Sequence, residues 1–162
     1  MNLKSIITCV LLAFAIFQAS AQQNVVNWKF SLQDKGNGEI ELVADARIQA
    51  GWHLYDTNIP KNTAFPTTLS ITKIAGVKII GQFKATQKPH ISFDPVFNAE
   101  IGTFEKSAKF VQRFKITDKA KFILEGDVRA QACDDETCTP PLPNHFTFKA
   151  SDLATIKSSK SK

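Results

Sequence analysis

Cysteine, tyrosine and methionine are scarce in this sequence of 162 residues, which has three cysteines, one tyrosine and one methionine. So few cysteines cannot form the dense disulfide framework that supports a small secreted scaffold. The three histidines, His53, His90 and His145, are far apart and show no ligand spacing with one another or with the cysteines. We therefore predict no metal site. No Gly-rich phosphate loop, Ser-His-Asp order or paired-carboxylate motif is present either, and we expect no cofactor.

No region carries a strong excess of charge of one sign. The formal net charge is +5, but the lysines are scattered, and only "KSSKSK" at the C-terminus forms a basic cluster. We interpret this charge as a solubility feature and predict no nucleic-acid partner. Residues 153–162 are expected to form a basic flexible tail.

A long apolar run occurs only at the N-terminus. In "MNLKSIITCVLLAFAIFQASA", Lys4 precedes the apolar residues 6–17, and the segment ends on an A-x-A cleavage site. The run is shorter than the roughly 20 residues that span a bilayer. We predict a cleavable signal peptide over residues 1–21, a mature chain that begins near Gln22, and periplasmic or other export without membrane insertion after cleavage. A retained anchor is the alternative.

Apolar residues of the mature chain recur at every second position, which is typical of half-buried β-strands. The pattern is clearest over residues 39–48 and 121–132. Shorter runs rich in β-branched and aromatic residues are typical strand segments as well; they cover residues 26–34, 67–74, 77–83, 109–117 and 144–150. Asn37-Gly38 is a hairpin signal between the first two segments. These seven or eight strands predict an all-β fold, an antiparallel immunoglobulin-like β-sandwich in one domain over residues 22–152.

The segment "ATQKPHISFDPVFNAE", residues 85–100, does not fit the strand pattern. It contains Pro89, Pro95 and two large apolar side chains, Phe93 and Phe97. A long irregular connection in a compact sandwich is usually functional or mobile. The two rings could plug the end of the core, or they could form a lid over a functional site.

Cleavage of the signal peptide would remove Cys9 and leave Cys133 and Cys138 in "RAQACDDETCTPPLPNHFTF". A disulfide between them would close a loop of six residues and contribute only about 2 kcal/mol. We expect both sulfurs at the rim of the sandwich, and the acids between them, Asp134, Asp135 and Glu136, should disfavour a thiolate. The residues alone leave a redox pair and a structural bridge equally open.

Three segments resemble the N-terminal periplasmic domain of the thiol:disulfide interchange protein DsbD. They are "QACDDETCTPP", "AGWHLYDTNI" and "FDPVFNAEIGTFEKSAKFVQRFKI", which occur in the family's order. The resemblance implies an immunoglobulin-like fold and a domain that takes electrons from a thioredoxin-like partner and passes them to periplasmic thiol-disulfide proteins. The sequence stops without the membrane-spanning and thioredoxin-like parts of that family, so we expect a separate membrane electron-transfer protein or thioredoxin-fold donor.

The same resemblance implies roles for individual residues. Cys138 would form mixed disulfides and Cys133 would resolve them. Phe97 or Phe93 would cover the pair from a cap loop, and Tyr55 and Trp52 would lie near the site. The alternative function is a binding module that keeps the fold and uses its disulfide only to stiffen a recognition loop.

Overall fold

The structure is a computed structural model that describes residues 24–156. It consists of strands and one short 3-10 helix, η1. The elements in chain order are β1 (Val26–Gly36), β2 (Glu39–Ile48), β3 (His53–Tyr55), β4 (Thr68–Ala75), β5 (Val77–Ala85), β6 (His90–Asp94), β7 (Ala99–Glu105), β8 (Ser107–Ile116), β9 (Ile123–Arg129), β10 (Ala132–Cys133), β11 (Asn144–Lys149) and η1 (Ala150–Ala154). Within residues 24–156, no helix is long and apolar enough to cross a membrane.

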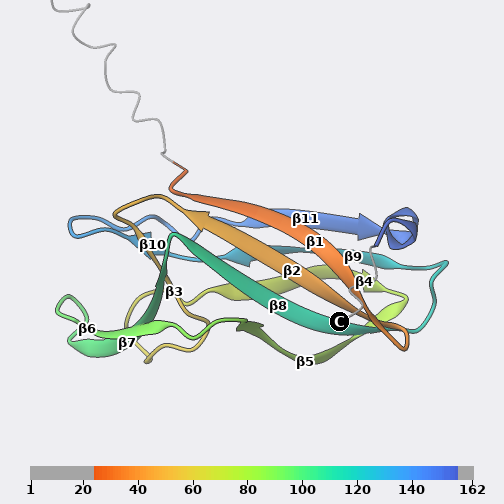
Figure 1. The fold of residues 1–162 in the computed structure, drawn as a ribbon, viewed down its shortest axis with the longest axis horizontal. Coiled ribbons are helices and arrows are strands. Elements are labelled where there is room, and N and C mark those ends of the chain that lie inside the picture. Colours follow the sequence, from red (N-terminus) through yellow and green to blue (C-terminus); the bar gives the residue numbers. More distant parts are fainter. Residues whose placement is uncertain (1–23, 157–162) are drawn as a thin grey trace, which may run out of the picture.

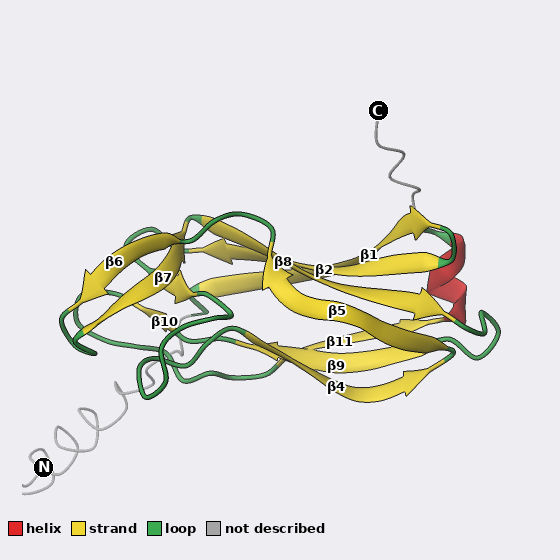
Figure 2. Cartoon of the chain, turned by 90° about the horizontal axis from the view of Figure 1, so that it is seen from below, coloured by secondary structure: helices red, strands yellow, loops and turns green. Residues whose placement is uncertain are grey.

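Two antiparallel sheets form the main body. One has the order β1-β2-β8-β5 and the other the order β11-β9-β4, and Figure 2 shows them as two stacked layers. Side chains from both layers meet between them, as when Phe30 of β1 contacts Phe146 of β11 with ring centroids 5.2 Å apart. The predicted all-β, immunoglobulin-like sandwich is therefore confirmed.

The hairpin between β1 and β2 forms where the sequence predicts it. β2 occupies the predicted residues 39–48, and its even-numbered side chains, such as Leu42, are buried in the core. At the turn, Asn37 and Gly38 have φ angles of 54° and 70°. Asparagine and glycine tolerate this left-handed backbone better than other residues, which explains why the chain reverses there.

A third, smaller sheet extends one end of the sandwich. Its order is β10-β3-β7-β6, and Figure 1 places it at the left-hand end of the molecule. The chain passes from β7 into β8 of the main body through Lys106, which has a φ angle of 63°. Segments far apart in sequence, around residues 53, 100 and 133, therefore meet at this end.

The prediction that residues 85–100 lack strand structure is wrong. The segment contains β6, which pairs with β7 from His90↔Thr103 to Asp94↔Ala99. β6 is an edge strand, and four of its five residues are exposed, so it has no alternation of buried and exposed positions to detect. Pro89 and Pro95 lie just outside its two ends, where a missing backbone donor does not interrupt the pairing.

Two predictions concern residues at the ends of the chain. The expected signal peptide, residues 1–21, and residues 157–162 of the expected tail lie outside the described residues. The start of the expected tail overlaps η1, which spans Ala150–Ala154.

Candidate redox cleft at the end of the sandwich

Cys133 and Cys138 form a disulfide at the base of a tight loop, residues 133–138, which we call the Cys loop. Their Cα atoms are 4.1 Å apart, and the two residues also form an isolated antiparallel β-bridge. Immediately outside the loop, the Thr139 amide donates to the Ala132 carbonyl at 2.8 Å. The Ala132 amide in turn donates to the Thr139 hydroxyl oxygen at 3.1 Å. These hydrogen bonds therefore hold the two ends of the Cys loop together in addition to the disulfide.

Asp134 shapes the turn inside the Cys loop. Its carboxylate oxygen Oδ1 accepts hydrogen bonds from the backbone amides of Glu136 at 2.9 Å and Thr137 at 2.7 Å. These donors, Glu136 first, lower the pKa of Asp134, with a further contribution from the nearby His53. Asp135 and Glu136 are exposed. The three acids that look alike in the sequence therefore have different structural roles.

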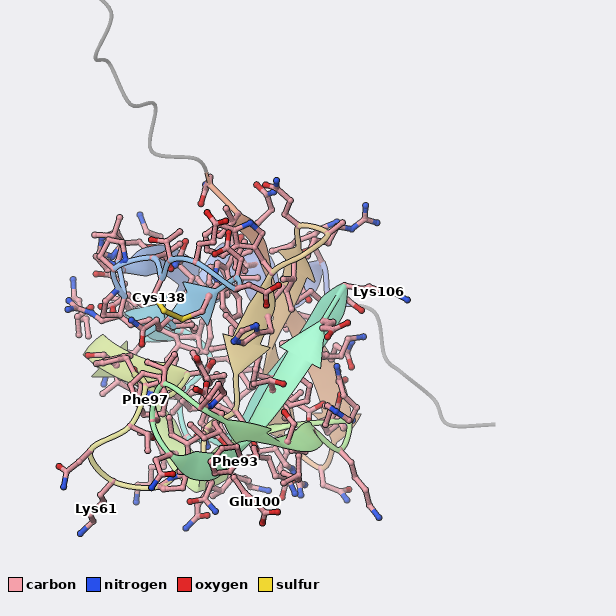
Figure 3. All side chains as sticks on the ribbon, turned by 90° about the vertical axis from the view of Figure 1, so that its left-hand side faces the viewer. Lys61, Phe93, Phe97, Glu100, Lys106 and Cys138 are labelled. Atoms are coloured by element: carbon pink, nitrogen blue, oxygen red, sulfur yellow. A yellow bond between two sulfur atoms is a disulfide. The ribbon has the colours of Figure 1, made fainter. Side chains whose placement is uncertain are left out.

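The two cysteines differ in exposure. Cys133 is only 3% exposed and belongs to a small apolar cluster with Tyr55, Ala64 and Ile101. Cys138 is exposed, and Figure 3 shows the disulfide at the end of the molecule that faces the viewer. A molecule that approaches this end reaches the Cys138 side of the disulfide first.

A cleft of about 780 Å³ separates the Cys loop from the hairpin of β6 and β7. We call this hairpin, residues 90–105, the cap hairpin, and the space the redox cleft. Phe97 is half-buried, packs against the cluster that contains Cys133 and lies edge-on to Tyr55 with centroids 6.4 Å apart. Phe93 also borders the cleft, but its side chain is 60% exposed. Figure 3 shows both rings at the same end of the molecule as Cys138.

Asp94 connects the cap hairpin to the body of the domain. Its Oδ1 accepts backbone hydrogen bonds from Val96 at 2.9 Å and Phe97 at 3.3 Å, which forms the turn at the hairpin tip. Its Oδ2 accepts a hydrogen bond from the Tyr55 hydroxyl at 3.4 Å. Burial, the negative charge of Asp94 and this hydrogen bond raise the pKa of Tyr55 to about 12.

His53 completes a row of three polar side chains. Its Nε2 lies 3.3 Å from the Tyr55 hydroxyl oxygen, and the two rings meet edge to face. His53 and Tyr55 both line the redox cleft, because alternate residues of a strand point to the same side. Trp52 does not line this cleft and packs instead against the core of the main body.

Sequence reasoning considered His53 only as a possible metal ligand, and it did not identify Asp94. The alternation within "HLY" could have placed His53 beside Tyr55, but it could not have placed either residue next to the cysteines. Within residues 24–156, no group of three or more His, Cys, Asp or Glu side chains is arranged to hold a metal ion.

The redox cleft is acidic, although the chain as a whole has a formal net charge of +5. No lysine or arginine is among its lining residues, and His53 and His90 are the lining side chains that can become cations. The lining includes five carboxylates, which are Asp94, Glu105, Asp134, Asp135 and Glu136. A cation that approaches the disulfide is therefore favoured over an anion.

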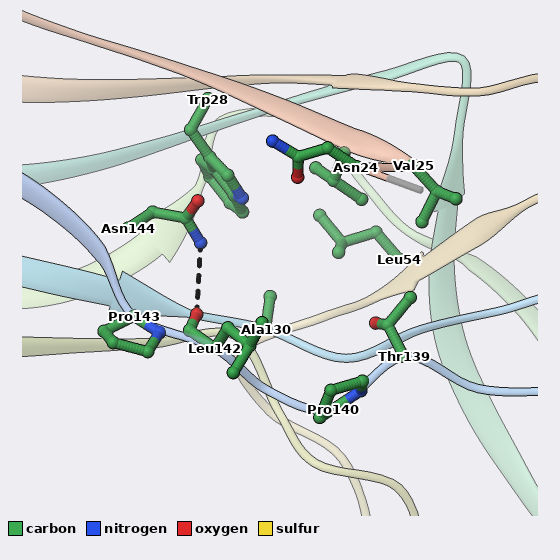
Figure 4. A pocket seen from close by; sticks show the side chains of 11 residues that line it. Asn24, Val25, Trp28, Leu54, Ala130, Thr139, Pro140, Leu142, Pro143 and Asn144 are labelled. Atoms are coloured by element: carbon green, nitrogen blue, oxygen red, sulfur yellow. Dashed lines mark hydrogen bonds between the residues drawn. The ribbon is translucent and has the colours of Figure 1, made fainter. Parts of the chain in front are cut away.

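The segment that leaves the Cys loop is held firmly against the main body. Asn144 donates from its side-chain amide to the carbonyls of Leu142 and Val128, each at 3.2 Å. Pro140 and Pro143 border a second cleft of about 350 Å³ on this side, shown in Figure 4. Proline restricts the backbone, so this segment forms a stiff support for Cys138.

The structure thus combines an immunoglobulin-like sandwich with a closely spaced, partly exposed cysteine pair in a cleft at its end, an arrangement that is compatible with thiol-disulfide exchange. Residues 18–150 match the family described as thiol:disulfide interchange protein DsbD, N-terminal. The chain belongs to this family. No curated protein sequence matches the chain.

Two solved structures have the same fold. The N-terminal periplasmic domain of ScsB from Proteus mirabilis has a TM-score of 0.54 at 12% identity, and the match covers 78% of this chain and 46% of that one. The chain thus spans about half of the length of that relative. The DsbD N-terminal domain of Neisseria meningitidis in its reduced form has a TM-score of 0.52 at 15% identity, and the match covers 75% of this chain and 84% of that one.

Proposed function

We propose that this protein is an exported redox relay domain whose Cys133–Cys138 pair passes electrons to the disulfides of thioredoxin-fold client proteins. A separate thioredoxin-like protein or membrane electron-transfer protein would reduce the pair again. One observation carries the proposal: the disulfide borders an open cleft, with Cys138 exposed and Cys133 buried. This asymmetry suits an exchange reaction, because one sulfur must be accessible to the client, while the second has only to reach the first in order to resolve the mixed disulfide.

The reaction proceeds in two balanced steps. The Cys138 thiolate attacks one sulfur of the client disulfide, a mixed disulfide forms, and the other client sulfur leaves as a thiolate. The Cys133 thiolate then attacks the Cys138 sulfur, which reforms the internal disulfide and releases the second client thiolate. Two electrons pass to the client, whose two thiolates take up the protons that the two cysteine thiols have released.

The surroundings of the pair support a working disulfide over a structural staple. Hydrogen bonds between Ala132 and Thr139 close the base of the Cys loop, and Asp134 holds its turn. The bond itself adds only about 2 kcal/mol through loop closure. Reduction would therefore leave the two sulfurs close together and ready to form the bond again.

The cap hairpin supplies a candidate lid. Phe97 packs against the cluster that contains Cys133, while Phe93 lies at the outer border of the cleft. In our proposal Phe97 shields the inner side of the disulfide and moves aside when a client docks, and Tyr55 supports the ring edge-on. Trp52 contributes to this arrangement only through the core beneath β3.

Trapping of the mixed disulfide tests this function. A Cys133→Ser variant, incubated with an oxidised thioredoxin-fold protein, should accumulate a covalent complex through Cys138 that dithiothreitol dissolves. The matched Cys138→Ser variant should accumulate little, because its remaining thiol is buried. The wild-type pair should also have a reduction potential above the roughly −300 mV limit of structural disulfides.

The alternative is a binding module with a structural disulfide. No complex with either single-cysteine variant, together with a wild-type potential below about −300 mV, would overturn the relay proposal in its favour.

A further inference from the structure

We propose that His53 accepts the proton of the Cys133 thiol when this residue resolves the mixed disulfide. The inference rests on the proposed exchange function and adds a proton acceptor to it. The reaction needs one because Cys133 is buried and next to carboxylates, two conditions that both disfavour a thiolate.

The strand pairing places His53 beside the resolving cysteine. Cys133 of β10 and His53 of β3 are directly opposite each other in the antiparallel register. Such partners point to the same face of the sheet, with Cβ atoms about 5 Å apart. Both side chains line the redox cleft. No other histidine is paired with either cysteine in the described sheets.

Tyr55 and Asp94 orient the imidazole. A carboxylate can only accept hydrogen bonds, so the Tyr55 hydroxyl donates its single proton to Asp94. The Tyr55 oxygen must then accept from His53, which assigns the proton of neutral His53 to Nε2. The remaining ring nitrogen, Nδ1, keeps its lone pair and can act as the base.

Several charged or titratable groups surround this imidazole. Glu105 of β7 is its register partner on the other side. Asp134 of the Cys loop is close enough for the charge of His53 to lower the pKa of its carboxyl group. The titratable groups that line the redox cleft together with His53 are Tyr55 on β3, Asp94 and His90 on β6, Glu105 on β7, and Cys133, Asp134, Asp135, Glu136 and Cys138 of the Cys loop.

The proton balance of the resolving step is simple. The Cys133 thiol transfers its proton to neutral His53, and the resulting thiolate attacks the Cys138 sulfur of the mixed disulfide. The bond between Cys138 and the client breaks, and the client sulfur leaves with the electron pair. The imidazolium then gives its proton to this leaving thiolate or to water, which returns His53 to its neutral form.

The test follows the two exchange steps separately with a neutral disulfide, 4,4′-dithiodipyridine, added in less than equimolar amount to the fully reduced chain. The first pyridinethione is released when Cys138 attacks and the second when Cys133 resolves. In His53→Gln the second release should be about tenfold slower at pH 7. For an ordinary thiol with a pKa of about 8.5, which is about 3% ionised at that pH, the effect would be limited to about 30-fold. The limit is higher for Cys133, because its burial and the nearby carboxylates disfavour the thiolate.

The pH profile distinguishes proton transfer from a structural effect. The wild-type and His53→Gln rates should converge in alkali, once the pH is high enough for the buried Cys133 thiol to ionise without a base. His90→Gln, which changes the other histidine of the cleft, is the matched control and should resolve at the wild-type rate. Tyr55→Phe should slow resolution partially and keep the wild-type pH profile, because it loosens the imidazole but leaves the base in place.

Three results would overturn the proposal. They are a wild-type rate in His53→Gln, a loss by the same factor at every pH, and full restoration of the rate by His53→Lys, which supplies a fixed positive charge but no base at pH 7. All three leave the exchange function standing. Failure of that function would appear instead as the absence of a mixed disulfide between Cys133→Ser and an oxidised thioredoxin-fold protein.

Discussion

The hydroxyl of Tyr55, on β3, donates a hydrogen bond to Oδ2 of Asp94, at the end of β6, over a distance of 3.4 Å. The two residues are 39 positions apart in the chain. This contact joins the cap hairpin to the strand next to the cysteines. Asp94 also accepts a hydrogen bond from the Phe97 amide, so the protonation state of Tyr55 is linked to the turn that carries Phe97.

Titration of Tyr55 should report this contact directly, because the chain has only one tyrosine. Burial, followed by the charge and hydrogen bond of Asp94, raises its pKa from the ordinary 10 to about 12. Tyrosinate absorbance should therefore have its midpoint near pH 12. Asp94→Asn should lower the midpoint but keep it above 10, since burial is the largest cause, and Glu100→Gln on the outer face of the cap hairpin should not change it.

The same shift predicts how stability changes in alkali. A raised pKa means that the folded state holds the proton more tightly than the unfolded chain does. The contribution of Tyr55 should be complete below pH 10 and disappear as the pH rises to about 12. A Tyr55 titration with its midpoint near pH 10 in the wild-type protein would contradict both the burial of Tyr55 and its contact with Asp94.

Truncation of the cap residues should separate a lid from a core plug. Phe97→Ala should speed reduction of the disulfide by dithiothreitol by a factor on the order of 3 to 10, because in our proposal its ring shields the inner side of the bond. It should lower the free energy of unfolding by about 1–2 kcal/mol, less than the roughly 3–5 kcal/mol for a fully buried phenylalanine. Phe93→Ala is the control and should change that free energy by less than about 0.5 kcal/mol. An unchanged reduction rate with a large loss of stability in Phe97→Ala would favour the core plug.

The acids of the Cys loop should slow the chemistry of Cys138. In the reduced protein, Asp135→Asn with Glu136→Gln should hasten alkylation of Cys138 by neutral iodoacetamide at pH 7 about threefold, because two nearby negative charges no longer disfavour the thiolate. Asp134→Asn should act in the same direction and keep the turn, since its side-chain oxygen still accepts the amides of Glu136 and Thr137. Glu125→Gln, on β9 outside the redox cleft, should have no effect. Equal rates in all variants would show that these charges do not act on the sulfur.

The charge of the redox cleft predicts a preference among small thiols. Each small thiol is compared by its relative rate, which is its rate with this disulfide divided by its rate with a neutral model disulfide. The relative rate of cysteamine, a cation, should exceed that of the anion 2-mercaptoethanesulfonate, so the ratio of the two should be above one. The ratio should fall as salt rises, because the Debye length shrinks from about 30 Å at 0.01 M to about 3 Å at 1 M. Asp135→Asn with Glu136→Gln should lower the low-salt ratio. A ratio near one at low salt would show that the carboxylates do not select the attacking thiol.

The sequence by itself was sufficient for the strands of the two main sheets and for the recognition of the cysteine pair. Strands with one buried face carry a period of two, so β2 could be read directly from residues 39–48. Asn37-Gly38 identified the first hairpin because few other residues accept its backbone angles. The cysteines are five positions apart, and a disulfide that closes so short a loop contributes little to stability. All these features depend on residues that are close together in the chain.

Only the tertiary structure decided what surrounds the two sulfurs. β6 shows no periodic pattern because most of its residues are exposed, so apolar and polar residues do not alternate along it. The burial of Cys133, the exposure of Cys138 and the row of His53, Tyr55 and Asp94 arise where β3, β6 and β10 meet. Contacts between such distant segments depend on strand order and register, and no local pattern in the sequence specifies which strand pairs with which.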